Sequence, residues 1–458
     1  MLAPLTLVAL ALAPQEPYTL HEDVQYSDAA RQPRRNRLDL FVPAADAPPP
    51  LVMFVHGGAW TGGSKDLFGR VGATLAERGF ACAVINTQLF PFAKPDAMVV
   101  DCAHALGYLH RHGEQYSYDG DRLFVMGHSS GAHLCSWLAY DDRKLALAGV
   151  PKRALRGAVL LSGVYDVRCH HMALDGVFGD DLALRRRAST WLYTDQGDCP
   201  AYVAWAQREL PGLSLCGRLM RDELRRKGVP VRSERYPGRT HRDYIFQFGT
   251  ARDLVTAPVV RFLEDPRGGA ARAREQAPGA ALWIAADDRE RRLGDLAAAA
   301  LAPAGVEVVV RAVSEPTGAR ATALFRDLGA ERAAAGLSPL RFLAGFGGGG
   351  VAVARSTLTP ATDGLAGRLV VGAPLPDANR GAAFDCLKEA PLLCILGDRD
   401  DAAVREGARR CTRALRRAGC DATPCELVGT TSEDALRQLD VGDDLVRPML
   451  LTFLSGAP

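Results

Sequence analysis

A glycine-flanked serine between a strand and a helix is the feature that most restricts the fold of this chain. The segment Gly127-His-Ser-Ser-Gly131 follows the apolar run LFVM and precedes AHLCSWLAY, whose apolar residues recur at helical spacing. A G-x-S-x-G sequence in this setting is typical of a tight turn that lifts the serine hydroxyl above the end of a sheet. The pattern therefore predicts a strand, a sharp turn and a helix, with Ser129 as a candidate nucleophile.

The residues around this turn alternate between strand-like and helix-like stretches. Strands that alternate with helices predict βαβ units and a mostly parallel sheet covered by helices on both faces, which is the α/β fold class. The strand-like runs are residues 51–55, 80–86, 123–126 and 157–161, and the helix-like stretches are 68–78, 99–110 and 132–140.

A glycine-rich motif, His56-Gly-Gly-Ala-Trp60, directly follows the strand-like run LVMFV. Glycine lets the backbone come close to a substrate, and the free N–H groups of such a loop can face a developing oxyanion. The residue after the nucleophile supplies a further N–H group in serine hydrolases with a G-x-S-x-G turn. The expected oxyanion-hole residues are therefore Gly57, Gly58, Ala59 and Ser130.

Taken together, these motifs resemble those of α/β-hydrolases of the carboxylesterase-like branch, which includes kynurenine formamidases and feruloyl-esterase-like BD-FAE proteins. The resemblance covers about residues 18–264. It implies an α/β-hydrolase fold and a triad in the chain order serine, acid, histidine. It rests on HGGAW with Gly62, Gly63 and Lys65, on GHSSGAHL (127–134), on SGVYDVR (162–168) and on Gly238-Arg-Thr-His241.

The resemblance points to His241 as the base and to Glu209 as the acid. His241 follows the strand-like VRSERY and a Pro-Gly turn, and Glu209 follows the strand-like PAYVAW. The family more often has aspartate at the acid position, so Glu209 is a departure, although either carboxylate can orient the imidazole. Asp166 and Asp198 are the alternatives for this role.

The implied activity is that of a serine hydrolase that cleaves a small carboxylic ester through an acyl-enzyme, with no metal or organic cofactor. An amidase of the N-formylkynurenine formamidase type is the alternative, and its substrate would be a small amide. Trp60 is expected to line the substrate pocket, or else to wall off the oxyanion loop. A third hypothesis, a non-catalytic binding or scaffold protein, would make the serine turn a relic.

The chain changes character at residues 265–280, whose Gly, Pro, Ala and Arg content predicts an exposed linker. All ten histidines precede it, so chemistry that needs imidazole belongs to the first part. The segment 391–400 nevertheless resembles 200–209 at an offset of 191 residues, and the same offset aligns 415–419 with 224–228. We hypothesise a tandem duplication in which 18–264 is catalytic and 281–458 is a degenerate α/β-hydrolase-like domain.

The second copy lacks the residues that its chemistry would need. At the offset of 191, Asp400 keeps the acid position, whereas Ser432 stands at the histidine position. Gly347 occupies the expected position of the serine, and the early strand ALWIAA runs into two aspartates rather than a glycine loop. A nucleotide site is the alternative, because Gly345, Gly347 and Gly350 match G-x-G-x-x-G with Asp363 downstream.

The charge balance gives no indication of a nucleic-acid partner. Lys and Arg number 55 against 53 Asp and Glu, a net charge of +2. No run of about 18 apolar residues predicts a membrane span.

Residues 1–17 contain an apolar stretch that ends in Ala11-Leu-Ala13, as before a signal-peptide cleavage site, but no basic residue precedes Arg31. A secreted or periplasmic location and a cytoplasmic one both stay open, as does the oligomeric state.

The cysteines and histidines do not form a recognisable metal motif. There are eleven cysteines and no C-x-x-C pair, which favours buried free thiols over a disulfide framework. Cys169-His-His171 places three metal-binding residue types side by side, but three adjacent residues cannot surround one ion. We therefore predict no metal site.

Overall fold

The structure is a computed structural model of the 458-residue chain. Residues 1–16 and 269–279 lie outside the described residues, and with them nearly all of the predicted N-terminal segment and most of the predicted linker. The described residues are 17–29, 31–168, 172–210, 212–268, 280–302, 306–335, 337, 339–354, 356, 365, 367–371, 373, 375, 392–397, 399–417, 422–427, 430–437, 439 and 446–454.

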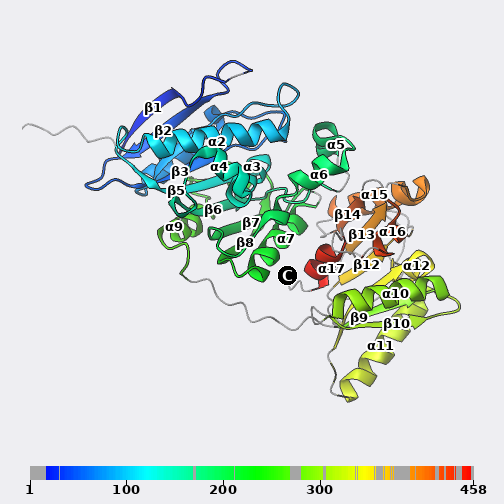
Figure 1. The fold of residues 1–458 in the computed structure, drawn as a ribbon. Coiled ribbons are helices and arrows are strands. Elements are labelled where there is room, and N and C mark those ends of the chain that lie inside the picture. Colours follow the sequence, from blue (N-terminus) through cyan, green and yellow to red (C-terminus); the bar gives the residue numbers. More distant parts are fainter. Residues whose placement is uncertain are drawn as a thin grey trace, which may run out of the picture.

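The first part of the chain forms an eight-stranded sheet in the order β1-β2-β4-β3-β5-β6-β7-β8. Strand β2 pairs antiparallel with both β1 and β4, and the remaining neighbours are parallel. The sheet is seen in blue to green in Figure 1. Its strands are β1 (Tyr18–Gln25), β2 (Arg37–Pro43), β3 (Pro50–Val55), β4 (Ala81–Ile85), β5 (Asp119–His128), β6 (Leu155–Leu161), β7 (Ala201–Arg208) and β8 (Val231–Thr240).

Helices cover both faces of this sheet because successive side chains of a buried strand point to opposite faces. In β3, Leu51, Met53 and Val55 pack into one core, and Val52 and Phe54 into the other. The first core also holds residues of α2 (Pro95–Arg111), α3 (Ser130–Tyr140), α4 (Asp142–Ala148) and α7 (Leu213–Arg226). The second holds α1 (Gly69–Ala76), α8 (Asp243–Phe246) and α9 (Thr256–Glu264).

The predicted fold class is confirmed by this topology, and each predicted strand and helix of residues 51–161 is present within a few residues of its expected ends. One local prediction was wrong. The Pro237-Gly238 pair does not end the strand before His241, because β8 continues to Thr240. Gly238 has φ +71°, and the pairing of β8 with β7 shifts register nearby, so the pair forms an irregularity inside the strand.

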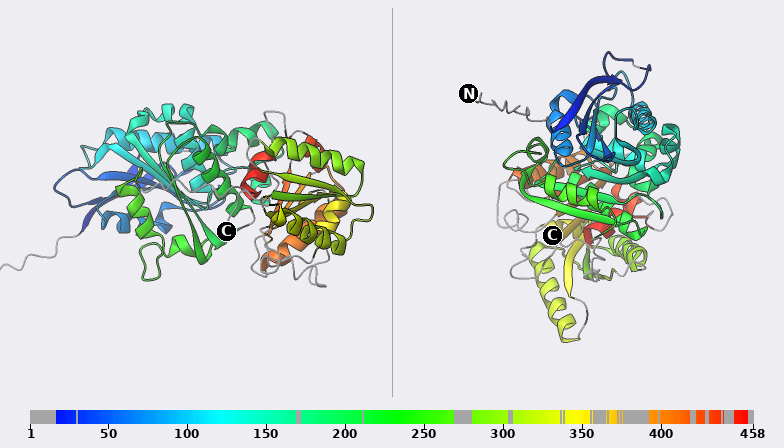
Figure 2. Two further views of the ribbon diagram at one scale, coloured as in Figure 1. Left: turned by 90° about the horizontal axis from the view of Figure 1, so that it is seen from below. Right: turned by 90° about the vertical axis from the view of Figure 1, so that its left-hand side faces the viewer.

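A second, six-stranded sheet follows, in the order β10-β9-β11-β12-β13-β14, with every pair parallel. The order matches that of β4-β3-β5-β6-β7-β8 in the first sheet. Figure 2 shows the two sheets as separate layered units. The strands are β9 (Ala280–Ala285), β10 (Val308–Ala312), β11 (Leu340–Phe346), β12 (Gly367–Val371), β13 (Leu392–Gly397) and β14 (Ala422–Leu427).

The helices of the second sheet are distributed like those of the first. One core contains α10 (Asp288–Leu301), α16 (Ser432–Arg437) and α17 (Arg447–Leu454), in the places of α1, α8 and α9. The other contains α11 (Gly318–Ala334), α12 (Gly347–Ala354) and α15 (Ala402–Arg417), in the places of α2, α3 and α7. Strands β13 and β14 and helix α17 each begin 191 residues after β7, β8 and α9. These are the relations that a duplication predicts.

The two units touch through helices α7 and α17 (Figure 1). Leu215 of α7 is buried in the same apolar cluster as Val446 and Leu450 from the end of the chain. Among the residues that the structure describes, no helix combines the length and the apolar character needed to cross a bilayer.

Candidate active site

Ser129 lies at the turn between β5 and α3, as the sequence predicts. Its backbone has φ +55° and ψ −123°, a strained combination for a residue with a side chain. The backbone N–H of Ser129 donates to the Leu161 carbonyl at 2.8 Å, which ties the turn to β6. A Cβ atom on Gly131 would collide with the Val55 carbonyl oxygen, so only glycine fits where α3 crosses the sheet.

The side chain of His241 reaches Ser129 from the loop after β8. Its Nε2 lies 3.0 Å from Ser129 Oγ, and the imidazole is mostly buried. His128, next to the serine, places its Nε2 2.8 Å from the His241 carbonyl oxygen and therefore donates to it. Burial, together with the neighbouring His241, lowers the pKa of His128 to about 3, so His128 stays neutral and holds the histidine loop against the serine turn.

Glu209 completes a hydrogen-bonded chain, because its Oε1 lies 2.5 Å from His241 Nδ1. The same carboxylate accepts from the N–H groups of Leu210 at 2.9 Å and Ala206 at 3.2 Å. Burial raises the pKa of Glu209, but the hydrogen bond from His241 and the other donors outweigh it and hold the pKa below its usual value. Glu209 is thus a carboxylate at neutral pH, His241 carries its proton on Nδ1, and Nε2 is free to accept from Ser129.

The two alternative acids lie elsewhere. Asp166 forms a buried ion pair with Arg168, with Oδ2 and Nη2 2.6 Å apart. Asp198 pairs with Lys152 at 2.9 Å. Of the three carboxylates considered, Glu209 is the one in contact with His241.

Sequence reasoning missed two hydroxyl groups behind Glu209. Ser162, which follows β6, donates to Glu209 Oε2 at 2.5 Å. Its Oγ also lies 2.6 Å from the hydroxyl of Tyr244, which therefore donates to Ser162 because the serine proton is already used. Their positions along the chain could have indicated both, because Ser162 directly follows a central strand and Tyr244 follows His241 by three residues.

The glycine loop after β3 lies against the serine turn. A Cβ atom on Gly57 would sit 2.9 Å from His128 Nδ1 and 3.1 Å from Ser129 Cβ, so glycine alone permits this approach. The loop then folds back, because the N–H groups of Thr61 and Gly62 donate to the Gly58 carbonyl at 3.1 Å and 3.0 Å. Ala59 and Trp60 follow with φ +52° and +60°. Ser130, the fourth predicted oxyanion residue, is the first residue of α3.

Trp60 is buried, and its indole N–H is engaged. Trp60 Nε1 donates to His133 Nδ1 at 3.3 Å, and His133 Nε2 donates in turn to the Ala188 carbonyl at 2.8 Å. The ring of Trp60 also meets that of Phe178 edge-on at 5.1 Å. Trp60 therefore links the glycine loop to the segment that carries α5 (Met172–Phe178) and α6 (Leu182–Ala188). Its contact with a substrate stays a prediction.

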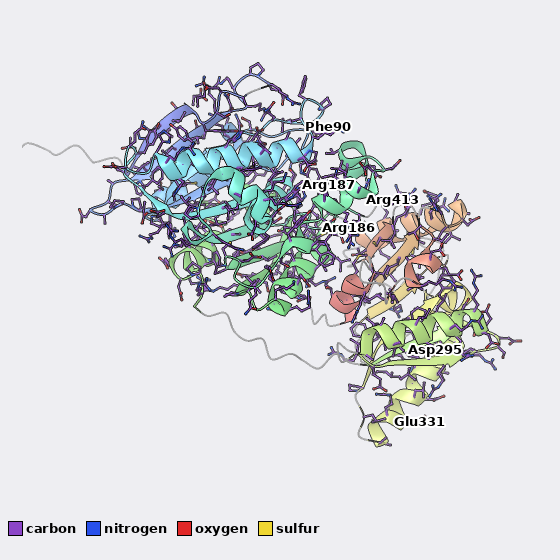
Figure 3. All side chains as sticks on the ribbon, viewed as in Figure 1. Phe90, Arg186, Arg187, Asp295, Glu331 and Arg413 are labelled. Carbon is purple, nitrogen blue, oxygen red and sulfur yellow. The ribbon has the colours of Figure 1, made fainter. Side chains whose placement is uncertain are left out.

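The end of α6 carries three arginines with different surroundings. Arg185 is fully buried and donates to Asp175 Oδ1 and to the Val167 carbonyl at 2.6 and 2.8 Å. Arg186 and Arg187 are exposed (Figure 3). Arg185 thus anchors the α5–α6 segment, and its neighbours form part of the solvated face.

The described residues contain no group of three metal-binding side chains, and Cys169-His-His171 lies outside them. Within the same described part of the chain, eight cysteines are present as free thiols, and all of them except the half-buried Cys216 are buried.

The corresponding turn of the second unit has the backbone of a nucleophile turn without its serine. Gly347 has φ +49°, close to the value at Ser129. A Cβ atom there would meet Glu290 Oε1 at 2.5 Å. Glu290, from α10, is buried and accepts the Ala286 N–H at 2.7 Å. A carboxylate thus fills the place where the nucleophile would project.

The aligned acid and base positions of the second unit are occupied by Asp400 and Ser432. Asp400 Oδ1 accepts the backbone N–H of Ser432 at 2.9 Å, so the aligned acid contacts the aligned base position without an imidazole. The carboxylate of Glu290 at the start of α12 also argues against a nucleotide there, because it would repel a phosphate. Asp363, the proposed ribose ligand, lies outside the described residues.

Three buried histidines give the fold a predicted acid sensitivity. Burial lowers the pKa of His56 and of His133 to about 4, and that of His128 to about 3. Below pH 6.5 the unfolded chain protonates these groups first, so the free energy of unfolding falls by roughly 1.4 kcal/mol per pH unit for each. Their contribution is complete above pH 6.5 and is lost down to about pH 4 for His56 and His133 and to about pH 3 for His128. Glu209 adds a loss only below its ordinary pKa of 4.5.

Thermal unfolding followed by circular dichroism between pH 8 and pH 5 checks this prediction. We expect Tm to be nearly constant above pH 7 and to fall steeply below pH 6.5. His133→Gln, whose amide can still donate to Ala188, should reduce the slope by about one third. A Tm that stays flat down to pH 5 would contradict the prediction.

Strand order, the serine turn and the position of the histidine loop together define an α/β-hydrolase fold. Residues 38–155 match the family model of the BD-FAE proteins, which confirms the resemblance predicted from the sequence motifs.

Curated relatives carry hydrolase names. A probable isoprenylcysteine alpha-carbonyl methylesterase of Arabidopsis thaliana is 38% identical over 121 residues, which are 26% of this chain and 24% of that protein. A kynurenine formamidase of Danio rerio is 27% identical over 254 residues, 53% of this chain and 81% of that enzyme. The chain thus spans only about a quarter of the length of the plant methylesterases that it matches.

Solved structures with a similar fold include esterase B from Lactobacillus Rhamnosis, at 20% identity and a TM-score of 0.48, covering 54% of this chain and 86% of that one. An esterase from Pyrobaculum calidifontis is 19% identical with a TM-score of 0.45, covering 50% and 80%.

Proposed function

We propose that the protein is a serine hydrolase that cleaves a small carboxylic ester through an acyl-enzyme. The observation that carries the proposal is the chain of contacts from Ser129 Oγ to His241 Nε2 at 3.0 Å and from His241 Nδ1 to Glu209 at 2.5 Å. A serine on a strained turn, a base within reach and a buried carboxylate behind the base are what nucleophilic acyl transfer requires.

In this mechanism, His241 accepts the Ser129 proton as Oγ attacks the ester carbonyl carbon. Glu209 holds the imidazole in the required tautomer and stabilises its protonated form. The backbone N–H groups of Gly57, Gly58, Ala59 and Ser130 stabilise the tetrahedral oxyanion. His241 returns the proton to the leaving alcohol, and the same histidine then activates water, which releases the acid and restores Ser129.

The second candidate is hydrolysis of an N-formyl amide. Its support is the alignment with the Danio rerio kynurenine formamidase, which extends over 81% of that enzyme. The same triad would serve, since amide and ester hydrolysis share the tetrahedral oxyanion. A non-catalytic scaffold is disfavoured because the first unit retains every element of the site.

The two units have different roles in this proposal. Residues 18–264 form the catalytic domain, 265–280 the linker predicted from the sequence, and 281–458 a duplicated and catalytically silent copy, except that Ala280 already belongs to strand β9 of the second unit. The matching strand order and the Glu290 carboxylate beside Gly347 support this assignment. The proposed silent unit contacts the catalytic one through helices α17 and α7.

A fluorophosphonate probe tests the nucleophile, because it labels only an activated serine. Peptide mapping of the labelled full-length protein should find the tag on Ser129 and on no serine after residue 280. Turnover of p-nitrophenyl acetate and butyrate should then be compared with that of N-formylkynurenine to decide between ester and formamide. A folded protein that neither reacts with the probe nor turns over these substrates would support the scaffold hypothesis.

A further inference from the structure

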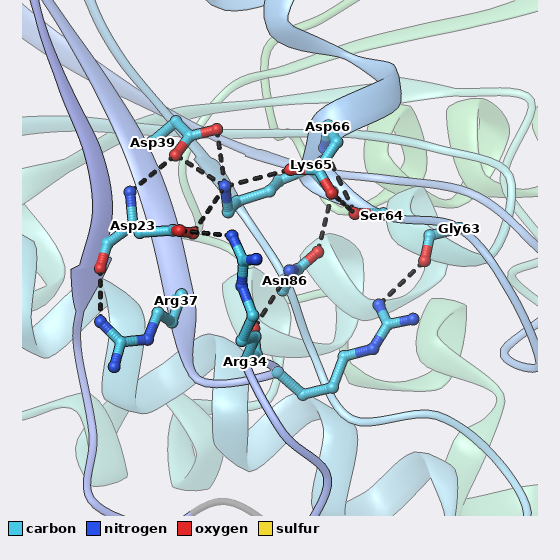
Figure 4. A network of polar contacts seen from close by, with 10 residues as sticks. Asp23, Arg34, Arg37, Asp39, Gly63, Ser64, Lys65, Asp66 and Asn86 are labelled. Carbon is cyan, nitrogen blue, oxygen red and sulfur yellow. Dashed lines mark hydrogen bonds and ion pairs between the residues drawn. The ribbon is translucent and has the colours of Figure 1, made fainter.

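The oxyanion loop ends at a lysine whose charge is almost completely buried. Lys65 begins the short helix η1 (Lys65–Leu67), and its side chain is only 4% exposed. Its ammonium group lies 2.7 and 2.8 Å from the two carboxylate oxygens of Asp39, 3.0 Å from Asp23 and 3.1 Å from Asp66 (Figure 4). Lysine is rarely buried to this degree unless it is paired, and here three carboxylates surround it.

The carboxylates belong mainly to the N-terminal hairpin. Asp39 lies in β2, and Asp23 lies at an irregularity of β1 where φ is +53°. The N–H of Asp23 donates to Asp39 Oδ1 at 2.9 Å, and Arg34 pairs with the Asp23 carboxylate. Arg37 donates to the Asp23 carbonyl at 2.8 Å. The irregularity therefore directs Asp23 to the lysine, and the cluster ties η1 to β1 and β2.

Two further contacts fix the backbone at the same end of the loop. The Lys65 N–H donates to Asn86 Oδ1 at 2.8 Å, and Arg35 Nη1 donates to the Gly63 carbonyl at 2.8 Å. Gly63 packs directly on the start of the loop, where a Cβ atom would collide with the Gly57 carbonyl and with His56. A shift of residues 63–65 would therefore displace Gly57, whose N–H is one of the proposed oxyanion donors.

We propose that Lys65, through its buried contacts with Asp39 and Asp23, is a positioning residue that holds the oxyanion loop in its catalytic conformation. This inference rests on the proposed esterase function. A loop with four glycines between residues 57 and 63 loses much conformational entropy on ordering. Donors to an oxyanion act only if they are preorganised at about 2.7–3.1 Å from the developing charge. The ion cluster restrains one end of this glycine-rich loop and so preorganises its N–H groups.

The test replaces Lys65 by methionine, which keeps an unbranched chain and removes the charge. The measured quantities are kcat per titrated active site and KM for p-nitrophenyl butyrate, with the active sites counted by fluorophosphonate. We expect kcat to fall roughly 10- to 100-fold with KM within about threefold, because oxyanion donors act in the transition state. Lys65→Arg should recover part of kcat. The matched control Lys152→Met removes a lysine that also pairs with two aspartates, Asp142 and Asp198, and should leave kcat unchanged.

A purely structural lysine would give a different result. It would lower Tm and the number of titratable sites, but kcat per site would equal that of the wild type, and this outcome overturns the proposal. If Lys65→Met does not fold, the Lys65→Met/Asp39→Asn pair removes the uncompensated carboxylate, and the same criteria apply. Failure of the wild type itself to react would instead refute the proposed esterase function.

Discussion

Replacement of Ser129 by alanine is expected to reduce kcat for p-nitrophenyl butyrate by about 10⁴- to 10⁶-fold. The substitution removes the proposed nucleophile, while His241 and the proposed oxyanion donors remain and sustain a small residual rate. The backbone at Ser129 is held by the contact with Leu161 and by the close approach of Gly131, neither of which involves the serine hydroxyl. The variant should therefore fold normally.

Initial rates under identical conditions and the loss of fluorophosphonate labelling check this result. Ser214→Ala removes a half-buried serine on α7 and is the matched control, for which we expect wild-type activity. Retention of more than a few per cent of activity by Ser129→Ala, in protein purified away from any wild-type enzyme, would mean that another residue is the nucleophile.

Replacement of Glu209 by glutamine is expected to lower kcat by about 10³- to 10⁴-fold with a much smaller change in KM. The donors to this carboxylate include His241 Nδ1, Ser162 Oγ and the N–H groups of Leu210 and Ala206. A glutamine amide presents an NH₂ group to one pair of these donors, so at least one contact becomes repulsive. The negative charge that stabilises the protonated imidazole is lost as well.

The second unit supplies the control for this variant. Asp400→Asn makes the same chemical change at the aligned acid, which accepts the backbone N–H of Ser432. We expect it to keep the wild-type kcat. Glu209→Asp, which retains the charge on a shorter side chain, should fall between the two. Equal activities of Glu209→Gln and the wild type would require another acid for His241.

The local parts of the fold and site could be predicted from the sequence. Apolar periodicity and punctuation by glycine and proline located the strands and helices of residues 51–161, because these signals depend on neighbours along the chain. The turn at Ser129 was predictable for the same reason. Glu209 was selected over Asp166 and Asp198 by the repeat offset and by its place after a strand, and the structure puts it beside His241.

Contacts between distant segments could not be predicted in this way. Ser162 and Tyr244 are 82 residues apart, and their meeting at Glu209 depends on the order in which strands β6, β7 and β8 pair. The same holds for Glu290 beside Gly347, where a helix after one strand reaches the turn after its neighbour. No periodicity in the sequence records such a juxtaposition.

The sequence by itself determined the α/β class, the serine turn, the order of the candidate triad and the absence of histidine from the second half. The tertiary structure decided which side chains support that triad. The buried ammonium group of Lys65, for example, pairs with Asp23 of β1 and Asp39 of β2, which precede it by up to 42 residues. The physical reason is that a buried charge is stable only where the folded chain surrounds it with opposite charge and hydrogen bonds. Which groups surround Lys65 depends on the pairing of β1 with β2 and on the packing of η1 against them.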